Sequence, residues 1–219
     1  MGDTVLSPGS LALADWRRQV AELYAAVRQH AEPEEAWRDF RAARDSLFKS
    51  HSQSPLSAAQ KRGFRALPFY PYDPAWRLLG IVDADVERET FSTVLADDGP
   101  FRYTRVARVR FEMRDVPLAL SLYWIEGYGG GLFLPFRDAS NGHTTYAGGR
   151  YLFDTIKGAD LGQHHGRLIM DFNFAFNPSC AYDDRWVCPL PLPENRLTVA
   201  VEAGEQNEKH NRRTDLNDA

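Results

Sequence analysis

The stretch at residues 104–125 reads TRVARVRFEMRDVPLALSLYWI, and it decides the fold. In its first half Val106, Val109 and Phe111 alternate with arginines, a period of two that is typical of a β-strand with one buried face. The alternation loses its phase once near residues 107–109, which predicts a bulge or a bend. The Met-Arg-Asp-Val segment that follows predicts a tight turn, and a second apolar run comes after it. Together these features predict an antiparallel hairpin.

Further strand-like segments lie on both sides of this hairpin. Together with the two strands of the hairpin, at 104–113 and 116–125, they form a series of short segments bounded by turn residues, at 77–82, 89–95, 131–136, 144–147, 150–155, 167–173 and 197–202. Many short strands spaced at roughly 8 to 15 residues are typical of an antiparallel sandwich or barrel. Residues 64–205 are therefore predicted to form one β-rich body.

The residues before this body have the periodicity of helices. Two segments each carry one apolar stripe with three-and-four spacing, formed by Leu13, Trp16, Val20, Leu23, Tyr24 and Val27 and then by Trp37, Phe40, Ala43, Leu47 and Phe48. Pro33 separates the segments and suits the first turn of the second helix. Ser57 and Gln60 resemble a capping box at the start of a short helical turn. Residues 11–63 are thus predicted to be a helical arm.

Two amphipathic helices in a row need a surface to cover, and the β-rich body is the surface available. The predicted fold class is therefore α+β, with N-terminal helices packed on an antiparallel β barrel or sandwich. The arm and the body are predicted to form a single domain at residues 11–205. Residues 1–10 are predicted to be a flexible lead-in, and residues 206–219, which have no apolar pattern, a disordered tail.

Composition excludes several classes of function. The net charge of −4, with no basic cluster, argues against a nucleic-acid-binding protein, because no surplus of cations exists to neutralise phosphates. The longest apolar run, residues 118–125, is too short to span a bilayer, and no leader pattern is visible at the N-terminus. We therefore expect a cytoplasmic protein without a membrane partner. In that compartment Cys180 and Cys188 are expected to be free thiols.

Residues 136–151 form the first candidate site segment. Asn141-Gly142 is a hairpin signal, and polar and aromatic side chains surround it, namely Asp138, His143, Tyr146, Arg150 and Tyr151. Alternate members of two hairpin arms would share one face and bind an anion or a hydroxylated molecule through Arg150 and the tyrosines. The alternative is a solvated hairpin with no ligand.

Residues 171–182, DFNFAFNPSCAY, form the second candidate segment. In a strand Asp171 and Asn173 share one face and the three phenylalanines share the other, so the polar pair is predicted to face solvent or a pocket. A carboxylate and an amide so placed can accept and donate hydrogen bonds to one ligand. The alternative, which is the commoner use of these side chains, is that they tether the next loop by binding its backbone N–H groups.

These two segments give one predicted site. Asp171 and His143 are its candidate catalytic residues, with one of them as general base. The candidate binding residues are Asp138, Tyr146, Arg150, Tyr151, Asn173 and Asn177. We expect Arg150 or Tyr146 to contact Asp171. No metal site is predicted, because the chain has no His-x-His or His-x-x-x-His pattern, and no cofactor is assigned.

Several motifs of the chain also resemble those of one family. They are HSQSPL at 51–56, FYPYDPAWR at 69–77, GGLFLPFRD at 130–138, YAGGRYL at 146–152, DFNFAFNPSCAY at 171–182 and CPLPLPENRL at 188–197. Together they are similar to a bacterial and archaeal family of proteins of about two hundred residues, known as a domain of unknown function. The resemblance covers residues 35–205 and implies one domain there. It implies no reaction, cofactor or catalytic residue.

The function that the sequence favours is the binding of a small polar or anionic molecule in a pocket of the β-rich body. Whether a reaction follows binding is left open, as is the oligomeric state. The alternative is a non-catalytic interaction or structural module in which the polar residues only tether loops. The two functions require different sites. An enzyme needs a concave pocket with a carboxylate of shifted pKa, whereas a module needs only a network of polar residues whose hydrogen bonds are all made within the protein.

Overall fold

The computed structural model describes residues 8–95 and 99–207 of the 219-residue chain. Its helices are α1 (Pro8–Gln29), α2 (Pro33–Ser50) and α3 (Ala58–Gly63). Its strands are β1 (Arg77–Asp83), β2 (Thr90–Val94), β3 (Pro100–Met113), β4 (Val116–Ile125), β5 (Gly131–Phe136), β6 (Arg150–Asp154), β7 (Gln163–His164) and β8 (Arg167–Asp171). Short 3-10 turns are η1 (Pro74–Trp76), η3 (Thr155–Lys157), η4 (Phe172–Phe174), η5 (Ser179–Ala181) and η6 (Pro193–Asn195).

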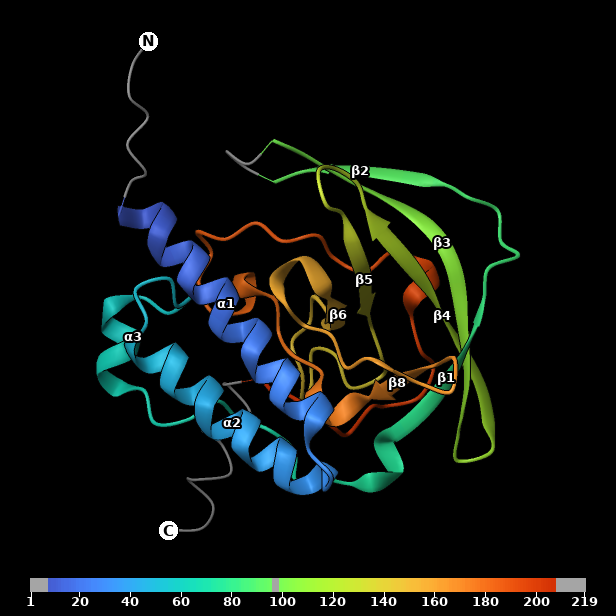
Figure 1. The fold of residues 1–219 in the computed structure, drawn as a ribbon, viewed down its shortest axis with the longest axis horizontal. Coiled ribbons are helices and arrows are strands. Elements are labelled where there is room, and N and C mark those ends of the chain that lie inside the picture. The colour runs from blue at the N-terminus through green and yellow to red at the C-terminus, as the bar shows by residue number, and fades with distance from the viewer. Residues whose placement is uncertain (1–7, 96–98, 208–219) are drawn as a thin grey trace.

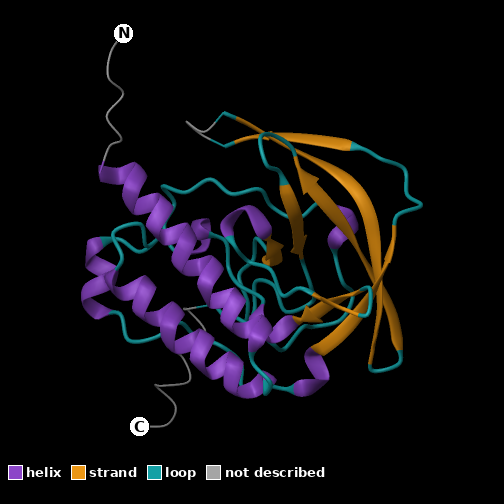
Figure 2. Ribbon diagram, viewed as in Figure 1, coloured by secondary structure: helices purple, strands orange, loops and turns teal. Residues whose placement is uncertain are grey.

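The strands form one curled antiparallel sheet in the order β6-β5-β4-β3-β1-β8-β7, with β2 paired to β3. The sheet is a half-barrel, and α1 and α2 lie side by side next to it (Figure 1). The long helices and the larger strands occupy opposite sides of the molecule (Figure 2). The α+β class with N-terminal helices against a barrel-like antiparallel body is thereby confirmed. Among the described residues, no helix has both the length and the apolar character needed to cross a membrane.

The hairpin predicted from residues 104–125 is present as β3 and β4. Their register is interrupted by a bulge between Arg105 and Ala107, next to the position where the sequence loses its alternation. The turn consists of Arg114 and Asp115, whose φ angles of 50° and 62° are both in the left-handed region. A two-residue turn with two positive φ angles matches the right-handed twist of the strands that it joins. Local sequence therefore determines this hairpin.

The helical arm is part of the main hydrophobic core. Tyr24 of α1 and Phe40 of α2 are buried and meet edge to face, with ring centroids 5.2 Å apart. Phe40 also packs against Phe174 of the body at 5.1 Å. The Trp37 indole N–H donates to the carbonyl oxygen of Asn173 at 3.1 Å, so a polar bond also joins the arm to the body. Leu13 is an exception to the predicted stripe, because it is 38% exposed near the start of α1.

Two predicted strands are wrong. In residues 144–147, the Thr144 and Thr145 N–H groups both donate back to the Ser140 carbonyl, so this segment is a series of turns. In residues 197–202, the Val201 N–H donates to the Asp138 side chain at 3.2 Å in place of a neighbouring strand. A side chain that binds the backbone in this way competes with a sheet ladder.

Other predicted boundaries also shift. The strand expected at 167–173 ends at Asp171, because residues 172–174 turn into η4. The first helix begins at Pro8, so residues 8–10 of the predicted lead-in are helical. The rest of the predicted lead-in and the tail beyond residue 207 lie outside the described residues.

Candidate functional site

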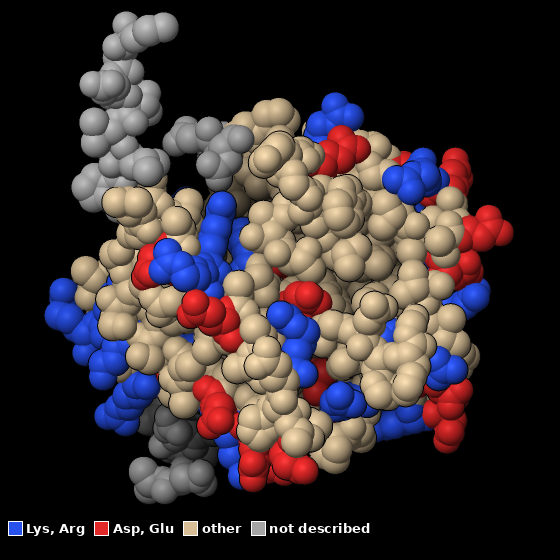
Figure 3. All heavy atoms as spheres, viewed as in Figure 1, with Lys and Arg blue, Asp and Glu red and all other residues tan. Residues whose placement is uncertain are grey.

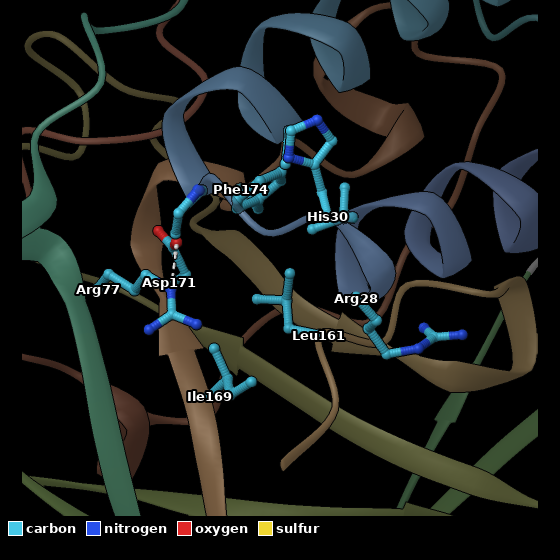
Figure 4. A pocket seen from close by; sticks show the side chains of 10 residues that line it. Arg28, His30, Arg77, Leu161, Ile169, Asp171 and Phe174 are labelled. Atoms are coloured by element: carbon cyan, nitrogen blue, oxygen red, sulfur yellow. Dashed lines mark ion pairs between the residues drawn. The ribbon is translucent and has the colours of Figure 1, made fainter. Parts of the chain in front are cut away.

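A cavity of about 70 Å³ lies where the end of α1 and the start of α2 meet strands β1 and β8. We call it the Asp171 cavity, and Figure 4 shows it from close by. It is lined by Val27, Arg28, His30, Pro33, Ala36, Arg77, Leu161, Ile169, Asp171 and Phe174. Six of its ten lining residues are apolar, and the four polar ones decide what it can bind.

Sheet register brings Asp171 and Arg77 together. Arg77 opens β1, Asp171 closes β8, and the two residues are direct partners in the antiparallel ladder. Cross-strand partners have adjacent side chains on one face of a sheet. The Arg77 Nε atom lies 3.7 Å from Asp171 Oδ2, an ion pair that Figure 4 marks with a dashed line. The carboxylate side chain is 2% exposed and the arginine side chain 37%, so the pair joins the interior to the surface.

Asp171 also ends the strand. Its Oδ1 atom accepts hydrogen bonds from the Asn173 backbone N–H at 3.1 Å and from the Asn173 amide at 2.9 Å. This is the bonding of a helix N-cap, and it turns the chain into η4. One carboxylate oxygen is therefore occupied by the fold, and the other faces Arg77.

Burial changes the acid strength of this carboxyl group. Loss of solvent raises the pKa of Asp171 from 3.8 to about 6, against the opposing effects of the Asn173 hydrogen bonds and the Arg77 charge. An acid with a pKa near 6 can both take up and release a proton close to neutral pH, which an ordinary aspartate cannot. Shifted carboxyl groups inside cavities are candidates for function on that ground.

The other basic residues of the cavity have different roles. The Arg28 guanidinium extends away from Asp171 in Figure 4 and lies 3.7 Å from the Asp160 carboxylate. The His30 ring is exposed, and its Nδ1 atom accepts a hydrogen bond from the Glu32 backbone N–H at 3.1 Å. Arg77 is therefore the cation in contact with Asp171.

The predicted site does not form as one cluster. Arg150 is paired with Asp138 at 2.9 Å, and both side chains are fully buried. Its terminal nitrogens also donate to the carbonyl oxygens of Val201, Ala203 and Glu205. The expectation that Arg150 contacts Asp171 is wrong, because the ladder gives Asp171 a different arginine.

The Asp138–Arg150 pair ties residues 201–205 to the sheet. Asp138 Oδ1 accepts from the Ser140 N–H at 2.7 Å and the Val201 N–H at 3.2 Å. Arg150 holds three carbonyl groups of the same C-terminal segment. These contacts are those of a loop tether, the alternative that the sequence left open.

The remaining predicted residues are dispersed. His143 is exposed in the loop after β5. The Tyr146 hydroxyl donates to the Cys180 sulfur at 3.6 Å, so Tyr146 does not contact Asp171 either. The Tyr151 hydroxyl donates to the Pro189 carbonyl at 2.5 Å, and the Asn177 amide to the Gln206 carbonyl at 3.0 Å.

Asn173 is a tether as well, and its geometry corrects a prediction. Its amide donates to the Asp73 carbonyl at 2.9 Å, and its Oδ1 accepts from the Asp73 N–H at 3.1 Å. Strand alternation had placed Asp171 and Asn173 on a face opposite to the phenylalanines. Both are buried with Phe172 and Phe174, because the segment is a 3-10 turn and not a strand.

Sequence reasoning found Asp171 and missed the residues around it. Arg77 stands at the end of the proline- and aromatic-rich segment at 69–77, where no local pattern marks it as a partner of Asp171. Arg28 lies in the last turn of α1 and His30 follows the helix, and neither belongs to a motif. Within the described ranges, His, Cys, Asp and Glu do not gather in any group of three or more that suits a metal ion.

The fold and the cavity define a class of protein, an α+β half-barrel with a packed helical arm and a small cavity that holds one buried carboxyl group. Residues 62–206 match the family model described as "Protein of unknown function (DUF1684)", and the chain belongs to this family. It is also similar to an uncharacterized protein from gene locus rrnAC0354 of Haloarcula marismortui, whose solution NMR structure has been determined. The identity is 31%, the TM-score is 0.56, and the match covers 79% of this chain and 93% of the other. The curated proteins contain no match to the chain.

Proposed function

We propose that the protein binds a small polar or anionic molecule in the Asp171 cavity and exchanges a proton with it. The observation that carries this proposal is the buried Asp171 carboxyl group, whose pKa is raised to about 6, beside the half-exposed Arg77. Burial costs stability when a carboxyl group is charged, and the Asn173 hydrogen bonds and the Arg77 charge offset only part of that cost at Asp171.

The cavity limits the size and chemistry of the ligand. Its volume of about 70 Å³ is roughly half of the 150 Å³ of an engineered cavity that holds benzene, so a ligand of more than about six heavy atoms is excluded. Arg77 can bind a carboxylate or phosphate group through its guanidinium fork. The free face of Asp171 can accept a hydrogen bond from a hydroxyl or amino group of the same molecule. A short hydroxy acid satisfies both residues.

The same geometry can support catalysis. In its charged form Asp171 would act as general base and take a proton from the ligand onto Oδ2, while Arg77 would stabilise the negative charge left behind. In its neutral form it would return the proton. His143, the other candidate base, is exposed and is not among the residues that line this cavity.

A non-catalytic module is the second candidate. The contacts of Asp138, Arg150 and Asn173 support it, since all three bind other parts of the chain. It gives no role to the Asp171 cavity or to Arg77, which lines that cavity beside the carboxyl group, and this is the reason we prefer the first. We also retain the proposal of a cytoplasmic location, which fractionation of expressing cells tests.

The experiment measures the melting temperature of the full chain in lactate, acetate and inorganic phosphate. Asp171→Asn and Arg77→Met remove the two groups in turn. Asp83→Asn and Arg110→Met are matched controls, because this pair lies at the other end of β1 with its charges 2.8 Å apart at the surface. We expect lactate to raise the melting temperature of wild type and of both controls, and of neither test variant. A rise that survives in both test variants, or no rise with any probe, would overturn the proposal.

A further inference from the structure

The two cysteines of the chain meet in the segment that follows η5. Cys180 lies in η5, and its backbone N–H donates to the sulfur of Cys188 at 3.4 Å. The two thiol groups also share a hydrogen bond. Neither cysteine lines the Asp171 cavity, so the pair can be tested independently of the proposed function.

This arrangement permits a disulfide bond. Two cysteines whose side chains point apart cannot be bridged unless the backbone moves. The thiols of Cys180 and Cys188 point toward each other, as their shared hydrogen bond shows. The S–S bond of a disulfide is about 2.05 Å long, so the two sulfur atoms have only to approach from hydrogen-bond distance. Rotation of the side chains provides a movement of that size.

Tyr146 acts on the sulfur of Cys180. Its hydroxyl donates to that sulfur at 3.6 Å. Its ring lies against the backbone of Gly148, where a Cβ atom would overlap the ring. A hydrogen bond donated to sulfur stabilises the thiolate, which is the nucleophilic form of cysteine. The hydrogen bonds from Cys188 and Tyr146 lower the pKa of Cys180 to about 6, against the effect of burial, so this cysteine is largely a thiolate at neutral pH.

Cys188 has the opposite character. Its hydrogen bond with Cys180 and its burial both raise its pKa, so it keeps its proton at neutral pH. Redox-sensitive cysteines are accessible thiolates that often lie beside a second cysteine, which resolves the oxidised form. Cys180 matches the first of these roles and Cys188 the second.

A small oxidant can reach the pair. Both cysteines are half-buried, and Cys188 also lines a cavity of about 70 Å³ between the helical arm and the body. A water molecule needs only about 10 to 15 Å³ of such space, so hydrogen peroxide fits. On the visible face of the molecule acidic and basic side chains are interspersed, with no extended patch of one sign to attract a charged oxidant (Figure 3). These features favour a small neutral oxidant.

We infer that Cys180 and Cys188 are a reversible modification site, which a hydroperoxide oxidises to an intramolecular disulfide. The Cys180 thiolate attacks one peroxide oxygen, the O–O bond breaks, and the departing hydroxide takes a proton from solvent and leaves as water. The Cys188 sulfur then attacks the sulfenic acid formed on Cys180. The S–S bond forms, the S–O bond breaks, and the hydroxyl group leaves with the Cys188 proton as a second water. Each sulfur loses one electron, and the peroxide gains two.

The disulfide would close a segment that contacts the helical arm. The Gln60 amide donates to the Tyr182 carbonyl at 2.7 Å, and the Trp186 indole N–H donates to the Pro55 carbonyl at 3.3 Å. A cross-link within this segment restricts the unfolded chain and leaves these contacts in place. Oxidation should therefore raise the melting temperature, and a thiol reductant should reverse the rise by disulfide exchange.

The test treats the reduced full chain with hydrogen peroxide, blocks the remaining thiols with iodoacetamide and digests the protein with trypsin. Cleavage after Arg167, Arg185 and Arg196 places the two cysteines in separate peptides, 168–185 and 186–196. We expect mass spectrometry to find these peptides joined after oxidation and separate after dithiothreitol. We also expect the oxidised protein to melt at a higher temperature than the reduced protein.

Two cysteine variants separate the roles of the pair. Cys188→Ser leaves the attacking thiolate without a resolving partner, so peroxide should produce a sulfenic acid at Cys180 that dimedone captures. Cys180→Ser leaves only the protonated thiol, which should react more slowly. The inference is overturned if peroxide yields no joined peptide, if it links only separate chains, or if Cys180→Ser is captured as fast as Cys188→Ser.

Tyr146→Phe tests the positioning residue through the pH profile of Cys180 alkylation by iodoacetamide. Loss of one hydrogen bond to the thiolate should move the midpoint of this profile upward by about one pH unit. Tyr123→Phe is the matched control, because the Tyr123 hydroxyl donates to the Glu194 carboxylate at 2.6 Å and to neither cysteine. This variant should keep the wild-type midpoint. An unchanged midpoint in Tyr146→Phe would refute the role given to Tyr146.

Discussion

Substitution of Asp171 by asparagine should make the protein more stable at neutral pH. The pKa of the Asp171 carboxyl group is raised to about 6 in the folded state, mainly because burial disfavours its charged form. The ordinary value, 3.8, applies to the unfolded chain. The difference between the two values corresponds to about 3 kcal/mol of unfolding free energy.

The sign follows from where the proton is held. The folded state keeps its proton to a higher pH than the unfolded state does, so it gains stability from this group below about pH 4 and loses it as the pH rises through 6. Asparagine does not titrate, and its amide oxygen can still accept the Asn173 hydrogen bonds that cap η4. The variant should therefore keep its unfolding free energy as the pH rises, whereas wild type loses part of its own.

The assay is urea denaturation of wild type and Asp171→Asn at several pH values between about 4 and 7.5. The unfolding free energy of the variant minus that of wild type should rise by about 2 to 3 kcal/mol across this interval, most steeply near pH 5, midway between the two pKa values. Asp83→Asn is the control, because its carboxylate is more exposed and lies at the end of β1, the strand that pairs with β8. A difference that stays constant with pH would refute our account of the Asp171 cavity as a site of shifted acidity.

Three further outcomes are expected. Arg150→Met should lower the unfolding free energy by about 3 to 5 kcal/mol, since it leaves the Asp138 carboxylate buried without a counter-ion; a loss below about 1 kcal/mol, measured by urea denaturation, would contradict the tether. Phe40→Ala should cost about 3 to 5 kcal/mol because Phe40 joins the arm to the core, and an unchanged melting temperature would show that the arm is dispensable. Iodoacetamide at neutral pH should modify Cys180 before Cys188, because the Cys188 thiol hydrogen bond lowers the pKa of Cys180 and the neighbouring Cys180 raises that of Cys188; mass spectrometry that finds the reverse order would refute this assignment.

The sequence by itself determined the elements whose stability is local. The β3–β4 hairpin follows from the alternation of residues 104–125 and from a two-residue turn, and both depend on neighbours in the chain. The helical arm follows from apolar stripes with helical spacing. A stripe of that kind is buried against an apolar surface, whichever part of the protein provides that surface. The family resemblance was likewise readable from short motifs along the chain.

The tertiary structure decided which polar residues meet. Asp171 was recognisable as an unusual carboxylate, but strand alternation failed for its neighbours because its own side chain caps a turn and ends the strand. Its partner, Arg77, was fixed by the register of β1 against β8, which no local pattern encodes. Arg150 forms its ion pair with Asp138 and donates hydrogen bonds to carbonyl groups of the C-terminal segment, so it does not contact Asp171. Local propensity acts over a few residues, whereas burial and ion pairing depend on segments far apart in the chain. The sequence therefore identified Asp171 as a candidate, and only the tertiary structure showed the cavity in which it lies.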